Sequence, residues 1–130
     1  MKIIVVDDSL LERKLLINIL IKNNVQHEIL QATNGQQALE ILSQNYKEVS
    51  LILLDWQMPE MDGLEFMKGV LKVPAVANIP IVMVTASGSD ENKKIAYEIN
   101  PRLAGYVIKP YKPDTLMGVI KPCLSSTIGS

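Results

Sequence analysis

The chain has 130 residues, which fits one domain with a sizeable core, and its net charge of −1 offers no general attraction to nucleic acid or anionic membranes. Its single cysteine excludes an internal disulfide, and no apolar run approaches the roughly 20 residues that a membrane helix needs. The apolar start before the first acidic pair is too short for a signal peptide. We therefore expect a cytoplasmic protein without a membrane span.

Five short aliphatic runs predict the strands of a buried sheet. The second run is more polar and is expected at the sheet edge, whereas the third is aliphatic throughout and is typical of a strand buried on both faces. The predicted strands cover residues 3–6, 26–32, 50–55, 79–84 and 105–108.

The segment after the first strand has the signals of an amphipathic helix. Ser9 with Glu12 three residues later predicts a capping box at its start. Leu11, Leu15 and Ile19 follow at helical spacing and predict an apolar stripe that faces the core.

Each later strand is also followed by a helical pattern. Pro122 is expected to shorten or kink the last helix, because proline lacks the backbone N–H that a helix interior uses. Residues 1–124 are expected to form the folded domain, and residues 125–130 a flexible tail. The later helices are predicted after the turn at Asn34-Gly35, after Gly63, from Ser89-Asp90 and from Pro113-Asp114.

Strand and helix thus alternate five times, which predicts a parallel sheet with helices on both faces. The carboxyl ends of parallel strands meet at one edge, where ligands bind in open α/β folds. Four of the five predicted strands end in polar residues, so we expect these side chains to gather: Asp7, Asp8, Asp55, Thr85 and Lys109.

This set of side chains is suited to phosphoryl chemistry. Three converging carboxylates repel one another unless a hard cation lies among them, and oxygen ligands suit Mg²⁺. Lys109 adds a fixed positive charge and Thr85 a hydroxyl group, whereas the set has no imidazole or thiol. A carboxylate can itself accept a phosphoryl group, and Asp55 is the best acceptor because its strand lies between the others.

The motifs at these strand ends resemble the receiver domain of two-component response regulators, the CheY-like domain, over residues 2–124. The resemblance implies a flavodoxin-like, doubly wound five-stranded parallel sheet in the order 2-1-3-4-5 with five helices. It rests on Asp7-Asp8 after the first strand, Asp55 with Met58-Pro59 and Asp62-Gly63 after the third, Thr85-Ala86 after the fourth, and Tyr106 to Lys109-Pro110 around the fifth.

The same resemblance implies a role for each acidic residue. Asp55 would be the phosphoacceptor. Mg²⁺ would be bound by the side chains of Asp8 and Asp55, by the backbone carbonyl of Gln57 and, through water, by Asp7. Gln57 stands where the family often has Asn, so we expect Gln57, together with Ser87, to set the lifetime of the phosphoryl group.

The resemblance also implies a switch. Thr85 and Lys109 would contact the phosphoryl oxygens, and the Lys109-Pro110 peptide bond would be cis. On phosphorylation, Thr85 would move toward the phosphoryl group and Tyr106 would turn inward, changing the surface made by the fourth helix, fifth strand and fifth helix.

The implied partners are proteins. The phosphoryl donor would be a sensor histidine kinase or a histidine phosphotransfer protein. The output protein is not named by the sequence, and chemotaxis, a phosphorelay and development are all open. We expect no direct DNA binding, a monomer or weak dimer, and a signalling domain that catalyses only its own phosphorylation and dephosphorylation.

Three other functions are compatible with parts of the pattern. A phosphohydrolase of the haloacid dehalogenase type would need an acid where Gln57 stands. An FMN-binding flavodoxin would need a phosphate loop where the repelling pair Asp7-Asp8 stands. A degenerate receiver that only docks would be expected to lack one of the acid, hydroxyl or lysine groups, and none is missing here.

Overall fold

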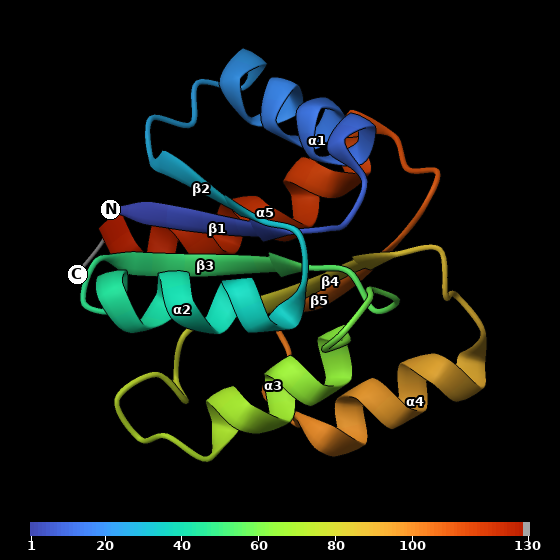
Figure 1. Cartoon of the computed structure of the whole chain (residues 1–130). Coiled ribbons are helices and arrows are strands. Elements are labelled where there is room, and N and C mark those ends of the chain that lie inside the picture. The colour runs from blue at the N-terminus through green and yellow to red at the C-terminus, as the bar shows by residue number, and fades with distance from the viewer. Residues whose placement is uncertain (129–130) are drawn as a thin grey trace.

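Strands and helices alternate along the whole described chain (Figure 1). The structure is a computed structural model and describes residues 1–128. The strands are β1 (Lys2–Val6), β2 (Glu28–Ala32), β3 (Val49–Leu54), β4 (Ile81–Thr85) and β5 (Gly105–Ile108). The helices are α1 (Leu10–Lys22), α2 (Gly35–Asn45), α3 (Gly63–Leu71), α4 (Asp90–Ile99) and α5 (Pro113–Ile128).

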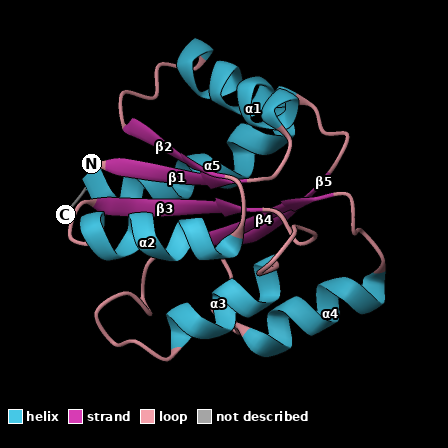
Figure 2. Ribbon diagram, in the orientation of Figure 1, coloured by secondary structure: helices cyan, strands magenta, loops and turns pink. Residues whose placement is uncertain are grey.

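The strands form one parallel sheet in the order β2-β1-β3-β4-β5 (Figure 2), which confirms the predicted topology. β3 lies in the middle, between β1 and β4, and each of its residues is buried. Its register pairs Leu54 with Val6 of β1, so β1 and β3 end side by side. The edge position of the polar strand β2 is confirmed as well.

Helices cover both faces of the sheet, and alternate strand residues feed two separate cores. Ile3 and Val5 of β1 pack with residues of α1 and α5, whereas Ile4 and Val6 pack on the opposite face with residues of α2 and α3. This alternation follows from the period of two along a strand. The aliphatic run of β3 is therefore explained by burial on both faces.

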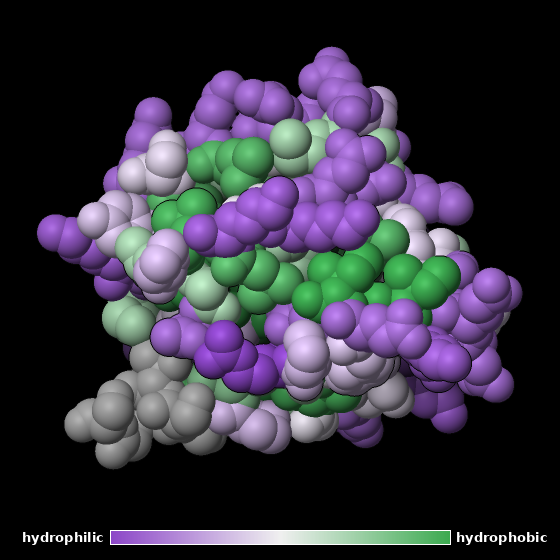
Figure 3. Space-filling view, turned by 90° about the horizontal axis from the view of Figure 1, so that it is seen from below, coloured by the Kyte–Doolittle hydropathy of each residue, from purple (hydrophilic) through white to green (hydrophobic). Residues whose placement is uncertain are grey.

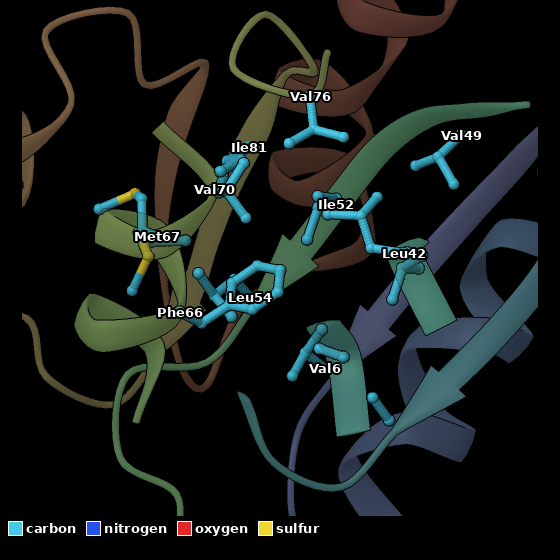
Figure 4. Close-up of a cluster of buried hydrophobic side chains, with 14 of the residues drawn as sticks. Val6, Leu42, Val49, Ile52, Leu54, Phe66, Met67, Val70, Val76 and Ile81 are labelled. Carbon is cyan, nitrogen blue, oxygen red and sulfur yellow. The ribbon is translucent and has the colours of Figure 1, made fainter. Parts of the chain in front are cut away.

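The core beneath α2 and α3 holds the largest buried side chain. Phe66 and Met67 of α3 are fully buried against Ile52 and Leu54 of β3 (Figure 4). Seen from below, from the side that α3 and α4 cover, apolar side chains form a band flanked by polar ones (Figure 3). No helix of the described chain is long and apolar enough to cross a membrane.

The predicted apolar stripe of α1 is right for Ile19 and wrong for Leu11 and Leu15. Leu11 and Leu15 are 76% and 51% exposed, and the helix instead packs on the sheet and α5 through Leu16, Ile19 and Leu20. The helix is apolar nearly all the way round. Periodicity alone could not select its buried face, which tertiary packing decides.

The predicted capping box of α1 is half right. The Ser9 hydroxyl accepts a hydrogen bond from the Glu12 backbone N–H at 3.2 Å, as expected of an N-cap. The Ser9 backbone N–H, however, donates to Asp7 Oδ1 at 2.9 Å rather than to the Glu12 side chain. The carboxylate of Glu12 is thus left for another partner.

Some predicted boundaries also differ from the structure. β4 begins at Ile81 rather than Ile79, because Pro80 has no N–H for the sheet. Pro122 does not shorten the last helix, since α5 continues through it to Ile128. The flexible tail predicted at 125–130 stays a prediction. The backbone of α5 extends to Ile128, and residues 129–130 lie outside the described residues.

Candidate functional site

Hydrogen bonds of the backbone carry the sheet one residue past its strands and align the polar residues that follow. The Asp55 N–H donates to the Val6 carbonyl at 2.9 Å, and the Lys109 N–H donates to the Thr85 carbonyl at 2.9 Å. Asp55, Thr85 and Lys109 are thereby held at the same edge of the sheet, beside the acidic pair that follows β1. The predicted gathering of these side chains at one edge of the sheet is thus observed.

Three carboxylates converge at this edge. One oxygen from each of Asp7, Asp8 and Asp55 lies within 4.8 Å of the others, with Asp7 and Asp55 buried and Asp8 exposed. Burial raises the pKa of Asp55, and the nearby Asp7 carboxylate adds to this, whereas the Lys109 ammonium opposes it. A set of oxygen donors with like charge fits a hard divalent cation such as Mg²⁺.

Lys109 reaches into this cluster from the end of β5. Its Nζ lies 2.6 Å from Asp7 Oδ2, 3.3 Å from Asp55 Oδ2 and 3.9 Å from Glu12 Oε2. Burial by itself lowers the pKa of Lys109, but the surrounding carboxylates outweigh it and raise this pKa above its ordinary value. The side chain therefore stays an ammonium across the physiological pH range.

A cavity of about 490 Å³ opens beside Asp55. Asp7 does not line it and lies behind Lys109, in keeping with a less direct role than that of Asp8. The cavity is lined by Asp8, Asp55, Gln57, Met58, Pro59, Thr85, Ala86, Ser87 and Lys109. All residues predicted to act at the phosphoryl group thus line one cavity, except Asp7 and the predicted switch residue Tyr106.

The segment after β4 links the cavity to Tyr106 of β5. The Ser87 N–H donates to the Thr85 hydroxyl at 3.2 Å, and the Tyr106 hydroxyl donates to the Ser87 carbonyl. The Tyr106 ring is half-buried and packs against the core beneath α3 and α4. The two predicted switch residues, Thr85 and Tyr106, therefore share Ser87 as a common neighbour.

The peptide bond between Lys109 and Pro110 is cis, as predicted. Comparison with known proteins agrees with the geometry: residues 3–121 match the family described as response regulator receiver domain. The chain belongs to this family of receiver domains.

Two solved structures and one curated relative illustrate the similarity. A chemotaxis protein CheY homolog of Campylobacter jejuni is 32% identical, and the match covers 99% of this chain and 96% of that protein. The structure of Vibrio cholerae chemotaxis protein CheY4 has a TM-score of 0.81 at 29% identity, covering 94% of this chain and 97% of that one. The phosphorylated cyanobacterial phytochrome response regulator RcpA has a TM-score of 0.78 at 26% identity, covering 95% and 91%.

Because the chain belongs to the receiver family, two of the alternative functions are set aside: the haloacid dehalogenase-type phosphohydrolase and the FMN-binding flavodoxin. As a receiver domain the chain is a signalling module rather than an enzyme with a separate substrate.

The loop between β3 and α3 holds Asp55 in place. The Trp56 N–H donates to Asp55 Oδ1 at 2.7 Å, and the Gly63 N–H donates to the Trp56 carbonyl at 2.8 Å. A Cβ atom at Gly63 would lie 2.1 Å from the Asp55 carbonyl oxygen, so only glycine permits this approach of α3 to the acceptor. Within the loop, Glu60 has a φ of 66°, a strained conformation for a residue with a side chain.

Sequence patterns missed three residues that support the site. Arg13 is buried, and its Nη1 donates to the Asp7 carbonyl at 2.7 Å while its Nε donates to Gln31 Oε1 at 2.9 Å. The Glu12 carboxylate lies within ion-pair distance of Lys109. Tyr111 is close enough for the charge of the same lysine to affect its pKa, and its hydroxyl group is buried. Nothing in the sequence distinguished Arg13, which stands between two other charged residues, Glu12 and Lys14.

Proposed function

We propose that this receiver domain is a phosphorylation switch in which Asp55 accepts a phosphoryl group from a phosphohistidine, with Mg²⁺ bound at the acidic cluster. The observation that carries the proposal is the position of Lys109. Its ammonium lies 3.3 Å from Asp55, beside a cavity that Asp8 and Asp55 of the acidic cluster line, so one fixed cation faces the acceptor. A buried lysine among carboxylates is suited to a dianionic phosphoryl group.

The transfer is a substitution at phosphorus. A carboxylate oxygen of Asp55 forms the new O–P bond while the P–N bond of the donor histidine breaks, and the electron pair of that bond leaves with the imidazole nitrogen. Lys109 would then pair with phosphoryl oxygens in place of the carboxylate. The Thr85 hydroxyl, which lines the same cavity, would donate a hydrogen bond to another of these oxygens.

Mg²⁺ would be held by the side chains of Asp8 and Asp55 and by the backbone carbonyl of Gln57, with Asp7 acting through water. Bound there, it would offset the charge that builds on the phosphoryl oxygens. The all-oxygen donor set supports this assignment. The similarity to RcpA, whose structure is of the phosphorylated protein, supports phosphorylation of the same family of sites.

The reverse reaction is attack of water on the phosphorus atom, which breaks the O–P bond and returns the carboxylate and inorganic phosphate. Gln57 and Ser87 line the cavity from two different loops, so their side chains can hinder or orient this water. We expect Gln57→Asn to change the dephosphorylation rate, measured as loss of phosphoprotein after the donor is removed. An unchanged rate would show that Gln57 does not set the lifetime.

The output would be a change in the face formed by α4, β5 and α5. Movement of the Thr85 hydroxyl toward the phosphoryl group would release Ser87, and with it the bond that Tyr106 makes to the Ser87 carbonyl. The donor would be a sensor histidine kinase or a histidine phosphotransfer protein, and the output another protein rather than DNA. The chain itself would act in the cytoplasm.

The decisive experiment is phosphorylation of the purified protein by acetyl phosphate with MgCl₂, followed by intact mass spectrometry. One phosphoryl group per chain is expected, and none for Asp55→Asn or after EDTA. Asp62→Asn, which alters a neighbouring carboxylate that caps α3, is the matched control and should label normally. Labelling that persists in Asp55→Asn would place the acceptor elsewhere, and no labelling of the wild type would leave a docking-only receiver.

A further inference from the structure

Among the three carboxylates that surround Lys109, that of Glu12 has no role in the site described so far. Glu12 belongs to the first turn of α1, and its Oε2 lies 3.9 Å from Lys109 Nζ. Its carboxylate does not complete the helix cap, because the Ser9 N–H donates to Asp7 instead. The side chain is 35% exposed, so it retains room to move.

Asp7, in contrast, has both carboxylate oxygens engaged. Oδ1 accepts the Ser9 N–H at 2.9 Å, and Oδ2 is paired with Lys109 at 2.6 Å. A divalent cation that draws on Asp7, directly or through water, would lie close to the ammonium and be repelled by it. Binding of a divalent cation at the acidic cluster therefore requires the ion pair between Lys109 and Asp7 to lengthen or break.

Glu12 is placed to receive the lysine without competing for the cation. The carboxylates that lie within 4.8 Å of one another in the described chain come from Asp7, Asp8 and Asp55, and Glu12 is outside this group. It is nevertheless within ion-pair distance of Lys109. An acid in this position attracts the ammonium away from the site of the cation.

We propose that Glu12 is a positioning residue that takes over Lys109 from Asp7 and so makes the acidic cluster available to Mg²⁺. This inference rests on the proposed function, because it concerns the same magnesium site. In the metal-free protein Lys109 is shared mainly by Asp7 and Asp55. In the loaded protein Glu12 keeps it near Asp55, where it meets the incoming phosphoryl group.

The test is the Mg²⁺ affinity of the unphosphorylated protein, measured by calorimetric titration with MgCl₂ and checked by the fluorescence of Trp56, the one tryptophan of the chain. Glu12→Gln is expected to weaken Mg²⁺ binding about three- to fivefold, the size of a partly exposed ion pair. Glu65→Gln is the matched control, because Glu65 is also the third residue after the N-cap of its helix. It should change the affinity by less than about twofold.

A double-mutant cycle separates an effect through Lys109 from the general field of a nearby acid. Lys109→Gln alone is expected to strengthen Mg²⁺ binding, because the repelling ammonium is gone. In that background Glu12→Gln should change the affinity no more than Glu65→Gln does. Circular dichroism confirms folding of each variant, and Lys109→Met replaces Lys109→Gln if the latter is unfolded.

Two results would overturn the inference alone: Glu12→Gln binding Mg²⁺ like Glu65→Gln, or a Glu12→Gln effect that persists in full when Lys109 is neutral. A wild-type protein that binds no Mg²⁺, or binds it equally well as Asp8→Asn, would overturn the magnesium site and the proposed function with it. Failure of the inference and failure of the function are thereby distinguished.

Discussion

Asp55 is buried beside two other carboxylates, and a single ammonium, that of Lys109, lies among them in the described chain. Burial raises the pKa of Asp55 despite that ammonium. The ionised acceptor therefore costs folding stability when no cation is bound, because a buried charge has lost its water and faces like charges. The arrangement of charges that suits phosphoryl transfer thus lowers the folding stability of the metal-free protein.

We predict that Asp55→Asn stabilises the metal-free protein by about 1 kcal/mol at neutral pH. Because the pKa is raised on folding, the folded state binds the Asp55 proton more readily than the unfolded state, and stability rises as pH falls toward that pKa. The advantage of Asp55→Asn should therefore shrink on acidification. Urea unfolding with EDTA at several pH values measures this.

Asp90→Asn provides the control, since Asp90 is exposed in the first turn of α4 and belongs to no carboxylate cluster of the described residues. An Asp55→Asn protein that is less stable than the wild type at neutral pH would contradict the prediction. It would mean that the pairing of Asp55 with Lys109 outweighs the burial of its charge.

Tyr111 carries a second local cost. Its hydroxyl is buried and has no hydrogen-bond partner in the described chain, and burial together with Glu12 raises the pKa of Tyr111 to about 12. The group stays protonated, so it is a buried donor without an acceptor. We predict that Tyr111→Phe raises the free energy of unfolding by about 1 kcal/mol, measured by thermal and urea unfolding.

Tyr97→Phe is the control for this substitution, because Tyr97 is an exposed tyrosine of α4. It should leave stability unchanged within about 0.5 kcal/mol. If Tyr111→Phe were destabilising, its hydroxyl would have a hydrogen-bond partner in solution, such as bound water.

At the scale of helices and strands, α5 contains a residue that does not suit a helix interior. Pro122 lies inside the helix and is exposed, so the Gly118 carbonyl four residues earlier lacks its usual N–H donor. We predict that Pro122→Ala stabilises the protein by about 1–3 kcal/mol, since it restores this bond and removes a poor helix former. The change in melting temperature measures the effect.

Lys121→Ala is the neighbouring exposed control and should be neutral within about 0.5 kcal/mol. If Pro122→Ala did not raise the melting temperature, α5 around residue 122 would already accommodate the proline without loss. The change in melting temperature therefore shows whether Pro122 lowers the stability of α5.

Elements with one possible burial pattern were predictable from the sequence, and elements with several were not. The run of β3 could only be a strand buried on both faces, and β5 was predicted residue for residue. For α1, apolar residues surround the helix, so Leu11 and Leu15 were placed on the wrong face. The burial of a side chain there depends on α5, which lies about a hundred residues away in sequence.

The residues of the site also fall into two groups, those that could be predicted from the sequence and those that could not. Asp55, Thr85 and Lys109 were predictable because each follows a strand, and parallel strands end at one edge. Glu12 and Tyr111 come from a helix face and a loop, and only tertiary packing turns them toward Lys109. Sequence position therefore identifies residues at the ends of strands, but not the helix and loop residues that adjust them.

At the scale of the whole molecule, the sheet lies between two cores, one on each face. Asp55 follows β3 at the edge of the sheet where the strands have their carboxyl ends. β3 contributes alternate residues to both cores, so Asp55 is anchored by the central strand of the sheet, all of whose residues are buried. A ligand that binds at this edge is coupled to unfolding of the entire domain, because the site exists only when the strands are paired.

We therefore predict that MgCl₂ stabilises the full chain, by about 1.4 kcal/mol for each tenfold excess over its dissociation constant. Differential scanning calorimetry should show a melting temperature that rises with MgCl₂ and returns to its starting value with EDTA. NaCl at equal ionic strength controls for screening. The rise should be lost in Asp8→Asn, and equal stabilisation of wild type and Asp8→Asn would contradict binding at the acidic cluster.

The close approach of Gly63 to the Asp55 carbonyl has a consequence for protein engineering. The first residue of α3 cannot carry a side chain, because a single methyl group at position 63 would clash with the backbone at the end of the strand and push the helix away from it. A chimera that borrows α3 from another protein would keep the position of Asp55 only if the graft begins with glycine. The rest of this helix can thus be redesigned more freely than its first residue.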